Sequence, residues 1–318
     1  MAFSDERIIR EQIIPYLALP VRKLVAGLPG EDLTRLEEIR LRCGKPVLLK
    51  IGERDISIDP RGNLTTKISE GYRVEQDDIY RTIAAISDNS LYAFEEEIRR
   101  GYITLRGGHR VGLAGQIVMK KDEVKTIKDF GSLVFRVARE VKNCAEPLLH
   151  HVVPPGRQGP LNTILISPPG CGKTTLLRDL ARLLSNGNGL VQPVNVAVID
   201  ERSELAGCYM GVPQLDVGPR TDVLDACPKA AGMIMALRSL SPRVIITDEI
   251  GRREDVDAVV ECLNAGVTVI TSAHAANAAE LQKRPLLSEM LERGAFKTGI
   301  VLSRRYGPGS VASIERWG

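Results

Sequence analysis

The chain has 318 residues, of which 43 are Lys or Arg and 40 are Asp or Glu, so its formal net charge is only +3. This length favours about two domains. Because the positive and negative charges nearly cancel, the composition argues against a nucleic-acid partner. The sequence has no apolar run long enough to cross a membrane, no signal-peptide segment and no CxxC pair among its six cysteines, which predicts a cytoplasmic protein with reduced thiols.

The first half of the chain has the mixed pattern of an α+β domain. Apolar residues at helical spacing predict a helix near the N-terminus, from Ile8 to Leu17, and a second helix over 74–94. Alternating or β-branched stretches predict strands at 36–42, 46–51 and 132–137, and a hairpin over 102–105 and 110–118.

A break in the pattern separates the two halves. The segment from Val153 to Pro160 holds three prolines and two glycines, and such a segment continues neither a helix nor a central strand. It predicts a linker at 153–160 between an α+β domain at 1–152 and a second domain at 161–318.

In the second half, strands alternate with helices. The strands are predicted at 163–167, 194–199, 243–247 and 267–272, and the helices at 174–184, 225–240 and 255–263. Strands that are apolar almost throughout and separated by amphipathic helices are typical of a parallel sheet covered on both faces. We therefore expect an α/β fold for this domain.

The first of these strands runs into a glycine-rich segment, SPPGCGKTT, which matches a P-loop except that Ser167 stands where the pattern has glycine. Glycines let the backbone curl so that its N–H groups point at phosphate oxygens, and the following helix adds its positive N-terminal end. The lysine is expected to reach the β- and γ-phosphates and the first threonine to ligate Mg²⁺. The expected ATP-binding residues are Ser167, Pro168, Pro169, Gly170, Cys171, Gly172, Lys173, Thr174 and Thr175.

A later apolar strand ends in Asp248 and Glu249, the pattern of a Walker B motif. Asp248 is expected to hold Mg²⁺ through water, and Glu249 to orient and polarise the attacking water. An extra strand, 194–199, lies between the two motifs in the sequence. This order favours a RecA-like or AAA-type ATPase over a nucleotide kinase or GTPase, so we expect ATP hydrolysis.

Two more strand ends carry polar side chains at the edge where open α/β sheets bind ligands. After strand 194–199, Glu201 or Glu204 could assist the metal or the water, or the segment could be a charged loop in which Asp200 caps a helix. After strand 267–272, His274 could contact the γ-phosphate. A lone histidine is also commonly structural, and both alternatives stay open.

The order of these motifs resembles that of the secretion ATPases of type II and type IV pilus systems. The segments 102–112, 125–129 and 216–225 resemble the stage III sporulation protein AA family more specifically, and the resemblance covers nearly the whole chain. It implies a RecA-like ATPase in a homo-oligomeric ring, a hexamer. It also implies a place in the mother cell of an endospore-forming bacterium, with the membrane proteins of the forespore channel operon as partners.

In secretion ATPases, arginines of the N-terminal domain approach the phosphates of a neighbouring subunit. Guanidinium groups suit this role because they bind phosphate oxygens bidentately. His109 and Arg110, directly after the pair Gly107-Gly108, are the first candidates to test, although a solvated strand face is the more common place for any one arginine. The full set of candidates is Arg40, Arg42, Arg110, Arg136 and Arg139.

Two other functions remain open. One is a RecA-like ATPase driven by nucleic acid, which the near-neutral charge and the aromatic content of only 4% disfavour. The other is a ring scaffold that binds ATP with little turnover, which the presence of Glu249 disfavours. In all three cases ATP is the only small-molecule substrate expected.

Overall fold

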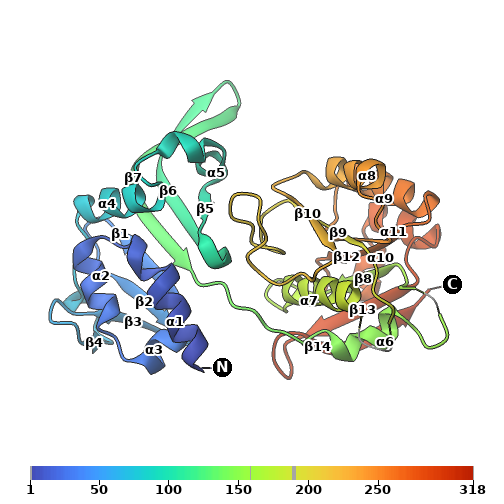
Figure 1. The fold of residues 1–318 in the computed structure, drawn as a ribbon, viewed down its shortest axis with the longest axis horizontal. Helices are drawn as coiled ribbons and strands as arrows, with labels where there is room; N and C mark the ends of the chain where they lie inside the picture. Colours follow the sequence, from blue (N-terminus) through green and yellow to red (C-terminus); the bar gives the residue numbers. More distant parts are fainter. Residues whose placement is uncertain (1, 158, 188–190, 318) are drawn as a thin grey trace. The chain divides into compact units, whose positions relative to one another are not determined.

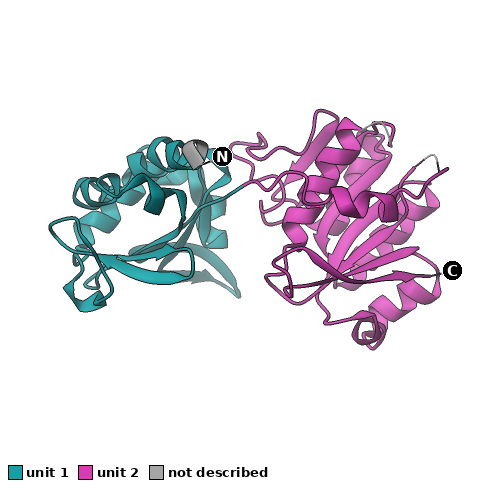
Figure 2. Ribbon diagram, turned by 90° about the horizontal axis from the view of Figure 1, so that it is seen from below, with its two compact units in different colours: residues 1–139 teal, residues 140–318 magenta. Residues whose placement is uncertain are grey.

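The computed structural model describes residues 2–157, 159–187 and 191–317. The chain forms two compact units, Met1–Arg139 and Glu140–Gly318, shown in different colours in Figure 2. Among the described residues, no helix combines the length and the apolar composition that crossing a membrane requires.

The first unit is built on a seven-stranded sheet with the order β4-β3-β2-β1-β7-β6-β5, in which all neighbouring strands are antiparallel. Its strands are β1 (Leu36–Arg42), β2 (Leu48–Ile51), β3 (Arg54–Ile58), β4 (Leu64–Thr65), β5 (Tyr102–Thr104), β6 (Arg110–Lys120) and β7 (Glu123–Arg136). Its helices are α1 (Ala2–Gln12), α2 (Leu19–Ala26), α3 (Gly30–Thr34), α4 (Gln76–Ile86) and α5 (Glu95–Arg100), with 3₁₀ turns η1 (Ile14–Tyr16), η2 (Ile68–Glu70), η3 (Leu91–Phe94) and η4 (Arg106–Gly108).

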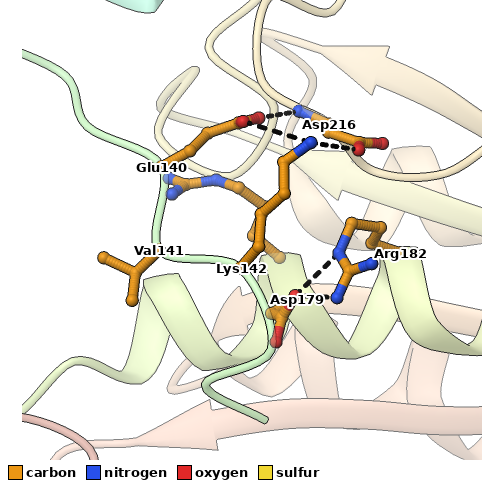
Figure 3. A pocket seen from close by; sticks show the side chains of 7 residues that line it. Glu140, Val141, Lys142, Asp179, Arg182 and Asp216 are labelled. Carbon is orange, nitrogen blue, oxygen red and sulfur yellow. Dashed lines mark hydrogen bonds and ion pairs between the residues drawn. The ribbon is translucent and has the colours of Figure 1, made fainter. Parts of the chain in front are cut away.

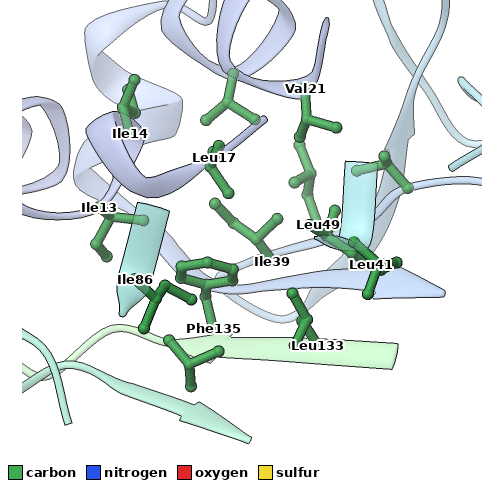
Figure 4. Close-up of a cluster of buried hydrophobic side chains, with 14 of the residues drawn as sticks. Ile13, Ile14, Leu17, Val21, Ile39, Leu41, Leu49, Ile86, Leu133 and Phe135 are labelled. Atoms are coloured by element: carbon green, nitrogen blue, oxygen red, sulfur yellow. The ribbon is translucent and has the colours of Figure 1, made fainter. Parts of the chain in front are cut away.

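The core of this unit explains its strand pattern. In β1, Ile39 and Leu41 are buried while Arg40 between them is half-exposed, because successive side chains of a strand point to opposite faces. Figure 4 shows these side chains packed with Leu17 and Phe135, each at most 1% exposed. Strand β1 is therefore confirmed, and so is a helix at the N-terminus, although it ends at Gln12 and a separate 3₁₀ turn follows before Leu17. Their apolar residues share one core.

Three predictions in this unit were only partly right. The helix predicted over 74–94 is present only as α4, which ends at Ile86, and η3 is a separate turn. The hairpin of β5 with β6 is present, with Tyr102 opposite Gly112, but β6 also continues into a longer hairpin with β7. The predicted strand 132–137 is the end of that longer strand. Charged residues around Lys121 hide the apolar alternation there, and the turn requires Lys121 at a positive φ of 54°.

The second unit contains a seven-stranded sheet with the order β10-β9-β11-β12-β8-β13-β14. All neighbours are parallel except β14, which pairs antiparallel with β13. Its strands are β8 (Thr163–Ile166), β9 (Val196–Asp200), β10 (Thr221–Asp225), β11 (Val244–Glu249), β12 (Thr268–Ala273), β13 (Thr298–Ser303) and β14 (Ser310–Arg316). Its helices are α6 (Leu149–Val152), α7 (Lys173–Asn186), α8 (Lys229–Ser239), α9 (Arg253–Asn264), α10 (Ala278–Gln282) and α11 (Pro285–Glu292), with one 3₁₀ turn, η5 (Glu146–Leu148).

Helices cover both faces of this sheet, as predicted (Figure 1). Leu176 and Leu180 of α7 belong to the core cluster on one face, and Met233 of α8 and Val259 of α9 belong to the cluster on the other. The helix predicted over 225–240 begins only at Lys229, because residues 221–225 form the parallel edge strand β10. The short charged sequence of β10 lacks the apolar run by which the other strands were recognised.

The boundary between the units lies before the expected linker. Residues 140–152 belong to the second unit, because Ala145, Leu148 and Val152 are buried in its core. Figure 3 shows how the start of this segment is held: Lys142 Nζ lies 2.7 Å from Asp216 Oδ2. Of the predicted linker, the described residues 153–157 and 159–160 thus lie inside the second unit and outside its helices and strands, and Gln158 lies outside the described residues.

Candidate functional site

The carboxyl ends of four neighbouring parallel strands bring the predicted motifs together. In the order β9-β11-β12-β8, β9 ends at Asp200, β11 at Glu249, β12 one residue before His274, and β8 one residue before the P-loop residue Ser167. Ligands of open α/β sheets bind at this edge. The site therefore depends on strand order, since these residues are far apart in the sequence.

The P-loop has the backbone that its glycines require. Gly170 and Gly172 have φ values of 74° and 87°, in the left-handed region that side chains rarely adopt. A Cβ atom at Gly172 would also lie 3.2 Å from the backbone nitrogen of Gly309. The last three residues of the P-loop, from Lys173 on, form the start of α7, a helix of 14 residues whose positive N-terminal end is of the kind that binds anions.

Lys173 is folded over its own loop. Its Nζ donates hydrogen bonds to the carbonyl oxygens of Ser167 at 2.8 Å and Pro168 at 3.1 Å, and the residue is only 8% exposed. Burial lowers the pKa of Lys173, and the carboxylate of Glu249 opposes this shift. The ammonium group therefore lies where phosphate oxygens, which are stronger acceptors than carbonyls, would draw it away.

His274 joins Lys173 to Glu249. Its Nδ1 lies 2.8 Å from Lys173 Nζ, and its Nε2 lies 2.9 Å from Glu249 Oε2. Lysine can only donate, so Nδ1 accepts from it, and Nε2 carries the proton that is donated to the carboxylate. The structure thus places His274 between the lysine predicted to bind phosphate and the carboxylate predicted to orient water.

The Asp248 carboxylate has the features of a cation ligand. Its Oδ1 is buried and accepts no hydrogen bond among the described residues, although Lys229 Nζ lies 3.1 Å from it. Burial raises the pKa of Asp248, and the ion pair with Lys229 opposes the rise. A buried carboxylate oxygen whose neighbour is a cation suits a hard cation such as Mg²⁺, which would take the place of the Lys229 ammonium group. Thr174, the second residue of α7, is the other predicted ligand.

Lys229 is a site residue that the sequence analysis missed. It is the first residue of α8 and 8% exposed, and its Nζ forms ion pairs with Glu201 and Asp248. Burial works to lower the pKa of Lys229, but the two carboxylates together raise it. A cation at a helix N-terminus opposes the helix dipole, so these carboxylates hold it there. The only signal in the sequence was a lysine directly after Pro228.

We expect the substitution Lys229→Met to destabilise the nucleotide-free protein by roughly 3 kcal/mol, the lower end for breaking a buried ion pair, because Glu201 stays partly hydrated. Urea unfolding measures this loss, and adding Mg²⁺ with ADP should restore part of it. Lys283→Met, which alters an exposed lysine of the same unit, is the control. Equal stability of the two variants would contradict an electrostatic role for Lys229.

The acidic residues at the end of β9 have different roles. Glu201 is linked to Asp248 because Lys229 forms an ion pair with both carboxylates, while Asp200 has a structural role. Asp200 is fully buried, and its carboxylate accepts hydrogen bonds at 2.8 Å from the backbone nitrogens of Glu204 and Ala206. Burial raises the pKa of Asp200, and these hydrogen bonds oppose the shift. The alternative in which Asp200 caps a helix is therefore replaced by a related role: Asp200 fixes the backbone of the loop that follows β9.

In the first unit, four of the five candidate arginines share one face of the sheet. Arg40 and Arg42 alternate with the buried Ile39 and Leu41 in β1. Glu38 lies opposite Arg136 in β7, which in turn lies opposite Arg110 in β6, and directly opposed residues point to the same face. Because these arginines come from three strands, only the sheet register reveals the group, which we call the arginine face: Arg40, Arg42, Arg110 and Arg136.

Contacts on the arginine face differ between its members. Arg110 stacks over the ring of Tyr102, with Cζ 3.8 Å from the ring centroid, in the geometry of a cation–π contact. Arg40 and Arg136 lie 2.6 and 3.9 Å from the carboxylate of Glu38. These pairs are partly exposed, so they contribute little to stability.

The remaining two candidates of this unit are structural. Arg139 donates to the carbonyl oxygens of Thr34 and Leu36, the latter at 2.9 Å, and so fixes the start of β1. His109 is 1% exposed, accepts a hydrogen bond at 3.0 Å from the backbone nitrogen of Ala138, and burial lowers its pKa to about 4. Neither side chain is available to a phosphate, so their proposed participation is not supported.

Comparisons with known proteins match this chain to one family. The family model described as "Sporulation stage III, protein AA" matches residues 7–317. The stage III sporulation protein AA of Bacillus subtilis (strain 168) is 43% identical over 304 residues, which cover 95% of this chain and 94% of that protein.

Solved structures show the same fold. The ATPase DotB of Legionella pneumophila matches with a TM-score of 0.58 at 16% identity, covering 90% of this chain and 77% of DotB. The pilus retraction motor PilT, solved with bound ADP, matches with a TM-score of 0.52 at 16% identity, covering 85% of this chain and 75% of PilT. The second unit is therefore a RecA-like P-loop domain, and the chain has the overall fold of secretion ATPases.

Proposed function

Because the chain belongs to the sporulation stage III, protein AA family, we propose that it hydrolyses ATP to ADP and phosphate in support of the channel between mother cell and forespore. The observation that carries the proposal is the hydrogen-bonded series Lys173–His274–Glu249 beside Asp248. At the edge of one sheet it joins Lys173 as the phosphate-binding group, His274 as a contact of the γ-phosphate and Glu249 as the general base.

The residues of the site would act in sequence. When ATP binds, Lys173 exchanges the carbonyl oxygens of its own loop for phosphate oxygens. His274 Nδ1 then loses its donor, so arrival of the phosphate changes the partner of the imidazole that holds Glu249. Glu249, whose side chain is 38% exposed, accepts a hydrogen bond from water and orients it towards the phosphorus.

Mg²⁺ would be held by the Thr174 hydroxyl and, through water, by Asp248, and would supply neutralisation of the phosphate charge. For Asp248 to do this, Lys229 must release it while keeping Glu201. The buried Asp248 Oδ1, which accepts no hydrogen bond among the described residues, supports this assignment.

We further propose a homo-oligomeric ring, a hexamer, on the cytoplasmic side of the mother-cell membrane, with the membrane proteins of the channel operon as partners. The arginine face supports a ring, because it gathers guanidinium groups on a different unit from the P-loop. A P-loop with one lysine leaves charge on the γ-phosphate that an arginine of a neighbouring protomer could stabilise.

Specific activity is therefore expected to rise with protein concentration. Dilute protomers lack the neighbour's arginines and should be nearly inactive, so phosphate release per protomer should increase as light scattering detects rings. Constant specific activity while the oligomer changes would contradict catalysis across protomers. Rings that bind MgATP tightly without turnover would instead indicate a nucleotide-dependent scaffold.

A further inference from the structure

The turn between β13 and β14 is attached to the P-loop. The backbone nitrogen of Gly309 in this turn donates to the carbonyl oxygen of Cys171 at 2.8 Å, and it is also the atom closest to a Cβ placed on Gly172. β13 pairs with β8, the strand that leads into the P-loop. The turn, residues 304–309, thus lies beside the P-loop in space, although most of the sequence of the second unit separates the two.

Arg304, the first residue of this turn, lies against the loop. A Cβ atom on Gly170 would lie 3.5 Å from Arg304 Nη2 and 3.6 Å from Arg304 Cζ, so the guanidinium group is directly beside the glycine. The structure gives the Arg304 side chain no ion pair or hydrogen bond to any described residue. Within residues 2–157, 159–187 and 191–317, therefore, no carboxylate neutralises this cation, which lies beside a loop of the kind that binds anions.

The strand order decides which part of a nucleotide this cation would meet. β8 has β12, which leads to His274, on one side and β13 on the other. His274 and Glu249 mark the side where the γ-phosphate reacts, so Arg304 approaches the loop from the opposite side. A nucleotide whose γ-phosphate faces His274 and Glu249 would therefore have the phosphates that ADP and ATP share nearer to Arg304.

We propose that Arg304 is a second cation of the P-loop, supplied by the same protomer, which binds the α- and β-phosphates of the nucleotide. This inference rests on the proposed ATP-binding function and adds Arg304 to the residues that bind the nucleotide. Planar guanidinium groups form strong charge-assisted hydrogen bonds with phosphate oxygens. In contrast to the arginine face, this contact requires no neighbouring protomer.

The chain offers a matched control in Arg305, which has the same charge in the same turn. Arg305 stacks over the exposed ring of Tyr306, with Cζ 5.4 Å from the ring centroid. Arg304→Ala and Arg305→Ala therefore remove the same charge from the domain, and only the first removes the group beside Gly170. Both side chains are exposed, so both variants should unfold at the temperature of the unmodified protein.

The test is titration of each variant with fluorescent methylanthraniloyl derivatives of ADP and of a non-hydrolysable ATP analogue in the presence of Mg²⁺. Arg304→Ala should weaken both nucleotides by about tenfold, and Arg304→Lys by less, because it keeps the charge. Arg305→Ala should stay within about twofold of the unmodified protein. Higher salt should narrow the difference between Arg304→Ala and the unmodified protein.

Two results would overturn the inference while leaving the proposed function intact. Equal affinities of Arg304→Ala and Arg305→Ala would show that the guanidinium group beside Gly170 does not bind phosphate. A loss confined to the ATP analogue would place Arg304 at the γ-phosphate instead. Failure of the unmodified protein to bind either nucleotide would reject the proposed function itself, and the inference with it.

Discussion

The substitution Glu249→Gln is expected to slow ATP turnover by about 10²- to 10⁴-fold, the usual cost of losing a general base, while ATP binding changes little. Glutamine keeps the size of the side chain and can still accept a hydrogen bond from His274 Nε2, which lies 2.9 Å from the carboxylate. It cannot take a proton from water. Phosphate release at saturating ATP measures the first effect, and equilibrium binding of ATP measures the second.

Lys173→Ala should have the opposite profile, with ATP binding itself lost, because the ammonium group is the charge at the centre of the loop. Glu254→Gln, an exposed carboxylate at the start of α9, is a matched control and should behave as the unmodified protein. If Glu249→Gln turned over ATP within a few-fold of the unmodified protein, the role of base would pass to Glu201. Glu201 is joined to Asp248 by Lys229.

Removing Arg110 is expected to reduce hydrolysis by assembled rings by about 10³-fold, the lower end of the contribution of an arginine supplied by a neighbour. The loss should be recoverable by mixing. Arg110→Ala protomers have an intact P-loop and Lys173→Ala protomers have an intact arginine, so some mixed interfaces combine both. Phosphate release by the mixture should then exceed that of either variant alone.

Arg139→Ala provides the contrast for this experiment, because Arg139 holds the carbonyl oxygens of Thr34 and Leu36. It should lower the stability of the first unit, and mixing with Lys173→Ala should not rescue a catalytic defect. If Arg110→Ala rings are fully active, or if mixed rings stay inactive, Arg110 is not the contributing residue. Arg40, Arg42 and Arg136 of the arginine face are then tested in the same way.

Features that depend only on residues close together in the sequence could be predicted from it. The P-loop needs glycine at Gly170 and Gly172 because of local backbone conformation, and the apolar runs of β8, β9, β11 and β12 identify buried parallel strands one at a time. Since ligand-binding side chains follow the carboxyl ends of such strands, Asp248, Glu249 and His274 could be named as candidates before their positions were known.

Features that depend on which segments become neighbours were decided only by the tertiary structure. Lys229 reaches Asp248 because α8 begins beside the ends of β9 and β11, and Arg304 reaches Gly170 because β13 pairs with β8. The arginine face likewise depends on the register of β1, β7 and β6. Sequence periodicity reports which face of an element is buried, but it contains no information on the partner against which that face packs. The same reason explains why the proline-rich segment marked the wrong boundary: the boundary is set by the core in which Ala145, Leu148, Leu149 and Val152 are buried.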